Sequence, residues 1–477
     1  MKKILTMLFA VACFVSSFAQ NRVSAKIDER TELLSVIFRL AGNTEYNRCM
    51  MPSFARATDI YFADYKEHKA VLFAQKLALE EGIGFDAPMS FALHLKWDQD
   101  TLTLNPDIAE NEEYRDRWKQ KSEEQFLRLI NQFYRETRFH DFFLAQQETY
   151  LQAENAMQEI LNKIDFKWFE TFFVPTDIEK NNNSYNLVIS ILNGPCNYGA
   201  QLPFNDGTRT MFSIMGCCDA DENGLPSYTI ESVLPTIIHE FCHSYCNPLN
   251  MKYWDMMRPG AERVFKKVRE EMSRQAYGHP LIMLNETFVR SSVICYMMAH
   301  YPEISLKSLI QDEETNYFVL TQDYVEALQT MEKSREQYPD MHSFMPKLAE
   351  IIKYFSFREF HKKQRNELKN CAKITCNIHD GQKNVPAGET EIIISFSKPM
   401  RPGIALGYGK MGAKFYPELI KKEDSNYQWS ENRQELHIFV KLKPHTQYSF
   451  SILGILYYTE DGYKGIGIHY IDFTTGN

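Results

Sequence analysis

Past residue 20, the chain has no uninterrupted apolar run of about 18 residues, the length that a membrane-spanning helix needs. It also lacks an excess of basic residues, because 53 Lys and Arg stand against 62 Asp and Glu and leave a net charge of −9. A nucleic-acid partner would require a basic stripe. Cysteine is scarce as well, with 10 in 477 residues, so the chain is not a small disulfide scaffold. The composition therefore argues against a membrane span and a nucleic-acid partner.

The first 19 residues have the pattern of a secretory signal peptide. A charged start, an apolar run over residues 4–14 and a small-x-Ala pattern at residues 17–19 are its three regions. We therefore expect an exported protein, which is periplasmic, on the cell surface or extracellular. The pair Ala12-Cys13 is a weak lipoprotein signal, so lipid anchoring is the less favoured alternative.

Cysteine usage leaves the disulfide pairing open. Removal of the signal peptide takes away Cys13 and leaves nine cysteines, so at least one thiol or metal ligand is unpaired. In an oxidising compartment Cys371 can pair with Cys376, or Cys217 with another cysteine.

The N-terminal part of the mature chain, residues 28–165, is predicted to be mostly helical. Apolar residues recur at helical spacing over 33–42 and 58–82, and again over 112–163 with breaks. The whole chain is 44% hydrophobic and 24% charged, which is the composition of an ordinary globular protein. Its length suits two or three domains.

After residue 165 the predicted secondary structure alternates between strands and helices. Strands are predicted at 185–193 and 210–216 from their β-branched and aromatic content, and they precede a helix. Helices return over about 280–370, where the charge run at 358–369 is expected to be a solvated helix face rather than a binding patch. Beyond residue 371 the pattern is all β. The predicted fold class is α+β.

One helix carries the residues with chemistry. Apolar residues at helical spacing predict it over 229–247, with Pro235 in its first turn and Asn247-Pro248 as its stop. It contains His239-Glu240-x-x-His243, whose four-residue step places both imidazoles on one face, as binding of one Zn²⁺ requires. Chance accounts for only about 0.05 such motifs in a chain of this composition. The alternative is a buried helix that merely packs two histidines.

A catalytic zinc site needs a third protein ligand, and Glu286 is the preferred candidate. It lies early in a predicted apolar helix that ends near residue 301. Arg290, one turn later on the same face, can hydrogen-bond that carboxylate or a substrate oxygen. The competing ligands are Glu262, His279 and Cys246.

The segment 197–200, Asn-Tyr-Gly-Ala, lies between the two predicted strands. An ordinary turn is the preferred interpretation. The alternative is an edge strand that lines the substrate site and pairs with an extended peptide.

These residues resemble a known group of enzymes. The motif at 239–243 followed by Asn285-Glu286 is similar to the gluzincin clan of zincin metallopeptidases, to which thermolysin-like enzymes belong. The stretches 32–42, 82–88, 239–248 and 334–339 resemble a secreted bacterial family known as a domain of unknown function, over residues 28–360. The resemblance implies His239, His243 and Glu286 as zinc ligands and Glu240 as general base. It assigns no residue that stabilises the transition state, for which Tyr277, His279 and Arg290 are candidates.

The C-terminal hundred residues are predicted to form a β-sandwich. Strands are expected at 391–397, 435–440, 447–452 and 469–473, separated by Gly, Pro and Asn turns. Their sequence resembles the bacterial Ig-like modules that follow secreted or surface enzymes. The resemblance implies a spacer or attachment module rather than a dedicated ligand binder.

Together these patterns predict a signal peptide (1–19), a largely helical zincin-like metallopeptidase domain (20–370) and an Ig-like sandwich (371–477). Within the second, helices at 28–165 and 280–370 flank the small sheet and metal helix at 185–250. The expected function is that of a secreted zinc metallopeptidase acting on peptides or proteins, with a zinc-bound water and Glu240 as base. The alternatives are a surface binding protein that keeps the zincin fold and a zinc amidase acting on a non-peptide amide.

Overall fold

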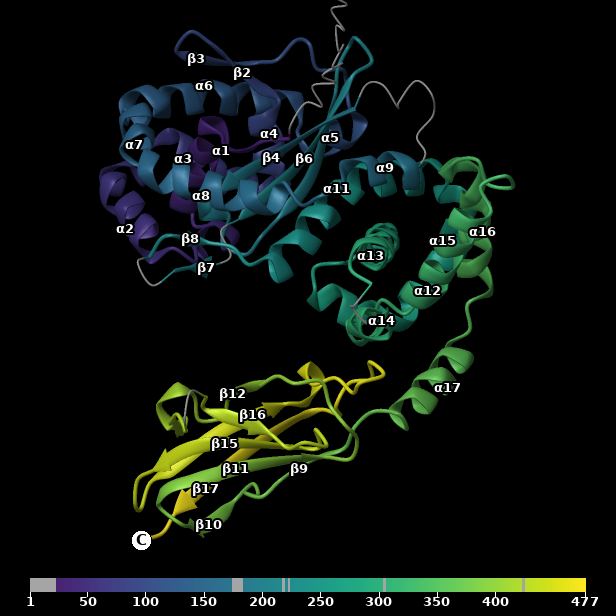
Figure 1. Cartoon of the computed structure of the whole chain (residues 1–477). Helices are drawn as coiled ribbons and strands as arrows, with labels where there is room; N and C mark the ends of the chain where they lie inside the picture. Colours follow the sequence, from purple (N-terminus) through teal and green to yellow (C-terminus); the bar gives the residue numbers. More distant parts are fainter. Residues whose placement is uncertain (1–22, 174–182, 217–218, 222–223, 303–305, 423–424) are drawn as a thin grey trace, which may run out of the picture. The chain divides into compact units, whose positions relative to one another are not determined.

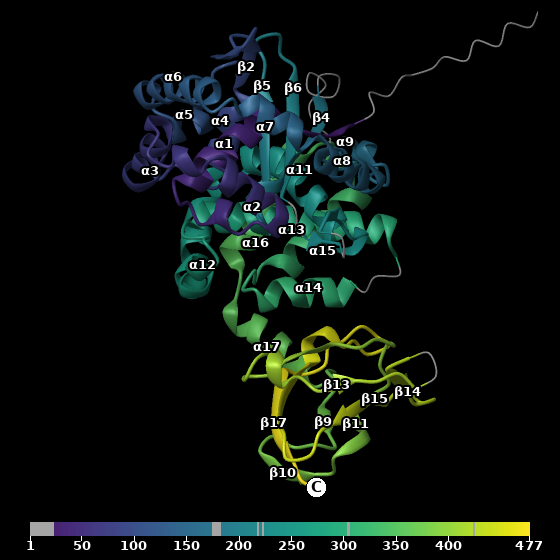
Figure 2. The same cartoon turned by 90° about the vertical axis from the view of Figure 1, so that its left-hand side faces the viewer.

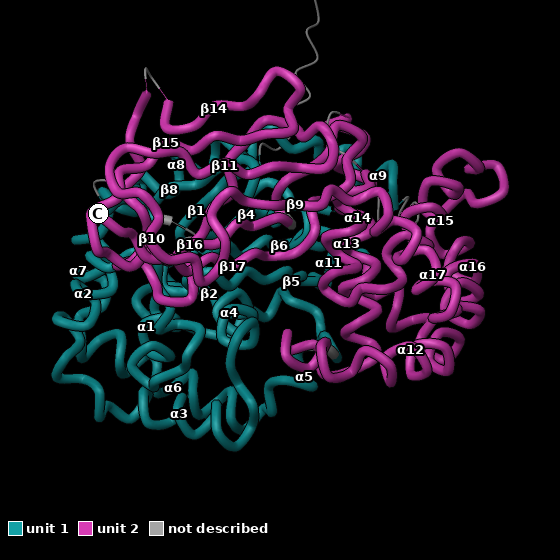
Figure 3. Tube along the Cα trace, turned by 90° about the horizontal axis from the view of Figure 1, so that it is seen from below, with its two compact units in different colours: residues 1–245 teal, residues 246–477 magenta. Residues whose placement is uncertain are grey.

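The computed structural model describes residues 23–173, 183–216, 219–221, 224–302, 306–422 and 425–477. The predicted signal peptide, Cys13 and Cys217 lie outside these residues. The fold is α+β, as predicted, and about half of the chain is helical. The chain divides into two compact units, residues 1–245 and 246–477 (Figure 3). Within the described part of the chain, no helix is long and apolar enough to cross a membrane.

The first unit is rich in short helices. They are α1 (Glu29–Leu40), α2 (Pro52–Tyr61), α3 (Lys69–Glu81), α4 (Asp86–Leu93), α5 (Glu112–Arg117), α6 (Gln120–Glu136), α7 (Phe139–Ala145), α8 (Gln147–Leu161) and α9 (Phe166–Phe173). The predicted helix over 58–82 is two helices, because the His68 side chain caps α3 by accepting from the Ala70 N–H. The expected breaks in 112–163 occur near residues 118, 138 and 146.

A four-stranded sheet lies among these helices. Its order is β1 (Ala25–Ile27), β4 (Asn183–Ser190), β6 (Arg209–Gly216), β5 (Tyr198–Pro203). The first three strands are parallel, with Leu187 opposite Ser213, and β5 runs antiparallel to β6 with Ala200 opposite Phe212. Figures 1 and 2 show β4 and β6 beside α1, α4 and α8. Two small hairpins, β2 (Leu95–Asp98) with β3 (Thr101–Leu104) and β7 (Asp219–Ala220) with β8 (Pro226–Ser227), complete the unit.

Helix α8 protects the short edge strand of this sheet. The Gln158 side chain accepts from the Ala25 N–H at 3.0 Å, and Glu154 accepts from the Ile27 N–H at 3.0 Å. These side chains occupy the backbone donors that an unprotected edge would offer to another chain. The predicted strands at 185–193 and 210–216 are confirmed, although residues 191–193 form a short 3-10 turn.

The second unit begins in the last turns of a helix, α11 (Ile230–Lys252), and is helical up to residue 368. Its helices are α12 (Trp254–Arg274), α13 (Pro280–His300), α14 (Leu306–Thr315), α15 (Thr321–Lys333), α16 (Met341–Tyr354) and α17 (Phe357–Leu368). Gly260 lets α12 approach α16 closely, since a Cβ there would lie 2.7 Å from Ile352 Cγ2. Arg263 then donates to the Ile352 and Phe355 carbonyls at the end of α16. On α17 only Phe360 is buried, as predicted for a solvated charged helix.

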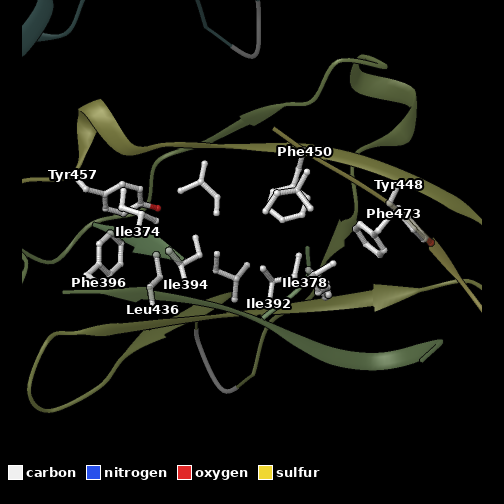
Figure 4. Packing of buried hydrophobic residues seen from close by; sticks show 14 of the residues in the cluster. Ile374, Ile378, Ile392, Ile394, Phe396, Leu436, Tyr448, Phe450, Tyr457 and Phe473 are labelled. Carbon is white, nitrogen blue, oxygen red and sulfur yellow. The ribbon is translucent and has the colours of Figure 1, made fainter. Parts of the chain in front are cut away.

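Two sheets form the C-terminal part of this unit. One has the order β10 (Gln382–Val385), β17 (Ile468–Thr475), β16 (Gln447–Leu453), β12 (Leu406–Tyr408). The other has β13 (Glu418–Leu419), β15 (Glu435–Leu442), β11 (Gly388–Phe396), β9 (Ile374–Cys376), with β14 (Tyr427–Trp429) also pairing β15. Figure 4 shows the buried side chains between the strand layers, Ile392 and Ile394 facing Phe450. The four predicted strands are confirmed.

The suggested bridge between Cys371 and Cys376 is wrong, because both are free thiols. The chain runs extended from residue 372 into β9. Five extended residues span about 16 Å, far beyond the roughly 7 Å that Cα atoms of a disulfide can bridge.

A buried carboxyl group lies at the centre of the first unit. Glu32 on α1 is 1% exposed, and its Oε1 accepts from the Ile191 N–H at 3.3 Å. Burial raises the pKa of Glu32 to about 7, although Ser190 and the Ile191 N–H act in the opposite direction. The native protein therefore holds a proton on Glu32 that the unfolded chain releases at lower pH.

We predict that Glu32 makes the first unit less stable as pH rises from about 4.5 to about 7, because the native state binds the extra proton over that range. The unfolding free energy of the wild type should fall by about 3 kcal/mol relative to Glu32→Gln between pH 4.5 and 8. Urea unfolding of both proteins at the two pH values measures this difference. A pH-independent difference would contradict the buried, protonated state.

Candidate metal centre

Helix α11 carries the His-Glu-x-x-His motif along a buried face. Val233, Ile237, Ile238 and Phe241 are each at most 1% exposed, which confirms the apolar stripe that predicted the helix. Two details of the prediction are wrong. Pro235 lies in the second turn rather than the first, and the helix passes through Pro248 to Lys252.

A proline inside a helix removes one backbone donor and its ring crowds the preceding turn, so a helix that continues past it needs other stabilising contacts. Beyond Pro248, Leu249 and Asn250 are buried, and Asn250 Nδ2 donates to Asn285 Oδ1 of α13 at 3.0 Å. This packing stabilises the last turn of α11 against the lost hydrogen bond. Residues 246–252, which follow the motif on α11, belong to the second unit.

The three motif residues form one compact group. Nε2 of His243 lies 3.1 Å from Nε2 of His239, and their rings are inclined by 79°. The ligand atoms of these two residues and of Glu240 all lie within 4.8 Å of one another. Glu240 is 6% exposed and both imidazoles are half-buried. The group can hold a metal ion, and no other His, Cys, Asp or Glu cluster in the described residues meets this criterion.

Strand β5 packs directly on the motif. A Cβ on Gly199 would lie 2.3 Å from the Glu240 carbonyl oxygen and 2.9 Å from His243 Cβ, so only glycine fits there. Next to it, Ser244 Oγ donates to the Ala200 carbonyl at 3.4 Å. The interpretation of residues 197–200 as an ordinary turn is wrong, because residues 198–203 form the edge strand of the sheet.

Aromatic packing fixes the helix around the motif. Phe241 lies edge-on to Phe166 and Tyr185, with ring centroids 5.5 and 5.4 Å apart. Tyr245 stacks on Phe173 at 4.5 Å and hydrogen-bonds to the Tyr185 hydroxyl. These contacts hold the backbone on both sides of His243, so its imidazole has little freedom to turn away.

Glu286 belongs to the second unit, on α13, and is 7% exposed. Arg290 Nε donates to Glu286 Oε2 at 3.2 Å, the contact that the one-turn spacing predicts. The same guanidinium donates to Glu313 at 2.8 Å and to the Tyr277 hydroxyl at 3.1 Å, and it lies 4.4 Å from the centre of the Phe318 ring. Burial alone would lower the pKa of Arg290, but Glu313 and Glu286 raise it above its ordinary value.

The competing ligand candidates occupy different environments in the second unit. Glu262 is exposed and pairs with Arg258 at 2.8 Å. His279 is exposed and caps α13, its Nδ1 accepting from the Leu281 N–H at 3.2 Å. Cys246 is buried, with its Sγ 3.9 Å from Ser292 Oγ on α13. Glu286 is therefore the buried carboxylate among the candidates.

Comparison with known proteins places the chain in a family. The family model described as Domain of unknown function (DUF4932) matches residues 23–353. The chain belongs to this family. The resemblance to a domain of unknown function over residues 28–360 is thereby confirmed, and the DUF4932 region includes both the motif on α11 and Glu286 on α13.

No curated protein matches this chain. Two solved structures match, "Structure of surface layer protein SbsC, domains 1-6" and "Crystal structure of the S-layer protein rSbsC(31-844)", at 14% and 13% identity. The matches cover 52% and 50% of this chain but only about a third of each S-layer chain, 34% and 33%, and the TM-score is 0.17 for both.

Sequence patterns missed Glu313, which shares the Arg290 guanidinium with Glu286. It lies 23 residues after Arg290, on α14 within the acidic run 312–314, and nothing distinguishes it there from a solvated acid. Gly199 lies in the segment 197–200 that the sequence analysis describes, and its glycine is a possible signal of a close backbone approach.

We predict that Gly199→Ala pushes β5 away from α11, because the new Cβ meets the Glu240 backbone. The unfolding free energy should fall by about 1 to 3 kcal/mol, and affinity for a divalent metal should fall with it. Gly403→Ala is the control, since its Cβ meets no atom within 4 Å. Denaturant unfolding and metal titration of both variants provide the comparison, and wild-type values for Gly199→Ala would contradict the close approach.

Proposed function

We propose that the chain is a zinc-dependent metallopeptidase with its metal on α11. The observation that carries the proposal is the 3.1 Å separation of the two Nε2 atoms of His239 and His243. Two nitrogens bound to one tetrahedral zinc at 2.0–2.1 Å stand about 3.3 Å apart. The two donors therefore fit zinc with little rearrangement. A hydrogen bond between neutral imidazoles would give a similar distance, and the metal titration below distinguishes the two.

Glu286 is the proposed third ligand. Its support comes from the second unit, where α13 packs on the last turns of α11 through Asn250–Asn285 and Cys246–Ser292 contacts. Glu286 lies on that helix and is buried beside Arg290. Carboxylates that bind a metal are usually hydrogen-bonded by a neighbouring group, and Arg290 is in place to do this for Glu286. Two histidines and one carboxylate form the donor set of hydrolytic zinc sites.

A zinc ion held by these residues would supply Lewis acidity, polarising the scissile carbonyl and lowering the pKa of a bound water. Glu240 is the general base and acid of the proposed reaction. Its carboxylate takes a proton from the attacking water and passes it to the leaving amine. A metal site that served only stability would need no carboxylate between the two histidines, so the presence of Glu240 favours the enzyme over a binding protein.

The edge strand supports a peptide as substrate. β5 ends the sheet, and in the described residues no strand pairs with the outer edge of 198–202. An extended peptide can add to such an edge by main-chain hydrogen bonds. Because Gly199 contacts the backbone of Glu240, a peptide on this edge would pass beside the catalytic group. Export and an Ig-like attachment role for residues 371–477 remain part of the proposal.

We predict that Glu240→Gln keeps the metal but lowers kcat on a mixed peptide library by about 10²- to 10⁴-fold, the contribution of a general base. His239→Ala and His243→Ala should each lose the metal and the activity, because each removes a donor. Glu286→Ala should bind zinc more weakly. Zinc content and peptide cleavage are measured side by side for all four variants.

The matched control for these variants is Glu262→Gln, whose carboxylate is exposed and paired with Arg258. It should retain zinc and activity. Stoichiometric zinc without cleavage by the wild type would contradict the peptidase and favour a binding protein or an amidase. A wild type that takes up no zinc would overturn the metal site itself.

We also predict that Arg290→Lys weakens zinc binding about 10- to 100-fold, since lysine keeps the charge but cannot reach Glu286, Glu313 and Tyr277 together. Chelator competition measures the affinity. Arg258→Lys, at an exposed pair, is the control and should behave as the wild type. Unchanged zinc affinity in a folded Arg290→Lys would argue against Glu286 as a ligand.

A further inference from the structure

The helical part of the second unit contains a cavity of about 770 Å³. Residues of α15, α16 and α17 line it, together with the end of α14. A volume of this size is typical of pockets that hold small molecules. The proposed zinc site uses none of the lining residues.

One side of the cavity is apolar and aromatic. Its wall includes Val319, Phe344, Phe355 and Phe360, all buried. Such a wall can accommodate the hydrocarbon or aromatic body of a ligand, and an aromatic face also attracts a cation within about 6 Å.

The lysines around the cavity already have carboxylate neighbours. Lys347 lies 3.1 Å from Glu350, Lys362 lies 3.6 Å from Glu359, and Lys363 lies 4.0 Å from Glu326. These six residues are exposed, so the pairs contribute little energy, but they account for each positive charge on the wall.

Two carboxyl groups of the wall form no direct ion pair, and Lys363 offsets their charge only in part. Glu314 and Asp323 line the cavity, and neither side chain makes a hydrogen bond or ion pair within the described residues. Glu314 is only 8% exposed. Burial raises the pKa of Glu314 to about 8 and also raises the pKa of Asp323, and in both cases Lys363 offsets only part of the effect. Neither residue has an oxygen among the fully buried, unpartnered side-chain atoms, so both carboxyl groups can meet a ligand that enters the cavity.

The nearest alternative partner is already engaged. Glu314 also borders a second cavity of about 260 Å³, whose wall includes Lys464. The Lys464 ammonium, however, forms an ion pair with Asp312. The second cavity therefore leaves the Glu314 carboxyl unpaired.

A metal ion is not the expected occupant. Within the described residues, the group on α11 is the one cluster whose His, Cys, Asp or Glu ligand atoms converge to within 4.8 Å. Glu314 and Asp323 thus do not form a preassembled metal site with a third acid. Two carboxyl groups beside an apolar wall instead match a ligand that has both a positive charge and an apolar body.

We propose that this cavity binds an organic ammonium ion that carries an apolar or aromatic tail. Glu314 and Asp323 face the ammonium group, and the aromatic wall receives the tail. The site is independent of the α11 metal centre, and its ligand need not be a substrate of that centre.

The probe is 4-phenylbutylamine, compared with the neutral 4-phenylbutan-1-ol, by isothermal titration calorimetry on the full chain. The wild type should bind the amine at least 10-fold more tightly than the alcohol. Above about pH 8, where the Glu314 carboxyl is ionised, Glu314→Gln and Asp323→Asn should each weaken amine binding at least 10-fold, because each removes a negative charge from the wall. Ala327→Trp, which fills the cavity from α15, should abolish binding of both compounds.

Glu350→Gln is the matched control, since Glu350 is exposed and lies outside the cavity wall. It should bind the amine as the wild type does. If Glu314→Gln does not fold, Asp323→Asn and Ala327→Trp still decide. The proposal is overturned if the wild type does not bind the amine, if the alcohol binds as tightly, or if the cavity variants bind like the control.

Discussion

The close approach of β5 to α11 is the constraint on which the candidate site depends. Gly199 allows the strand to lie against the Glu240 carbonyl, where a Cβ would be only 2.3 Å away. That contact brings the edge of the sheet to the helix that carries both histidines. A helix alone sets the spacing of two imidazoles, but it cannot supply an extended surface beside them. The sheet supplies that surface, and glycine makes the contact possible.

The surroundings of the site then restrict its motion. The rings around Phe241 and Tyr245 hold α11 against β4 and α9 on both sides of His243. The core of the same unit contains Glu32, a carboxyl that burial keeps protonated near neutral pH. Its Oε1 accepts from the Ile191 N–H, and protonation removes the cost of burying a charge there. The aromatic layer beside the motif has no such pH dependence, so the helix position is set by packing.

Sequence patterns predicted what is encoded locally. The helix of the motif follows from apolar spacing, and the Arg290–Glu286 contact follows from one helical turn. The errors concern tertiary contacts. The sequence predicts a stop at Pro248 because the packing that stabilises the next turn comes from α13, which is distant along the chain. It predicts a turn at 197–200 because a glycine that fits against a helix has the same local signature as one that bends the chain. Glu313 gave no signal at all, since its partner lies on another helix.

The second unit has acidic side chains in two different settings, one around Arg290 and the other at the cavity. Two carboxylates, a phenol and an aromatic ring surround the Arg290 guanidinium. These contacts on several sides fix the position of the guanidinium. Such a network orients a group and resists change. At the cavity the balance of charges is different, because Glu314 and Asp323 line a partly apolar wall without a direct ion pair, and Lys363 offsets their charge only in part. Arg290 is paired with acids of its own chain, whereas Glu314 has no such partner at the cavity. A positive charge on a bound ligand would supply that partner.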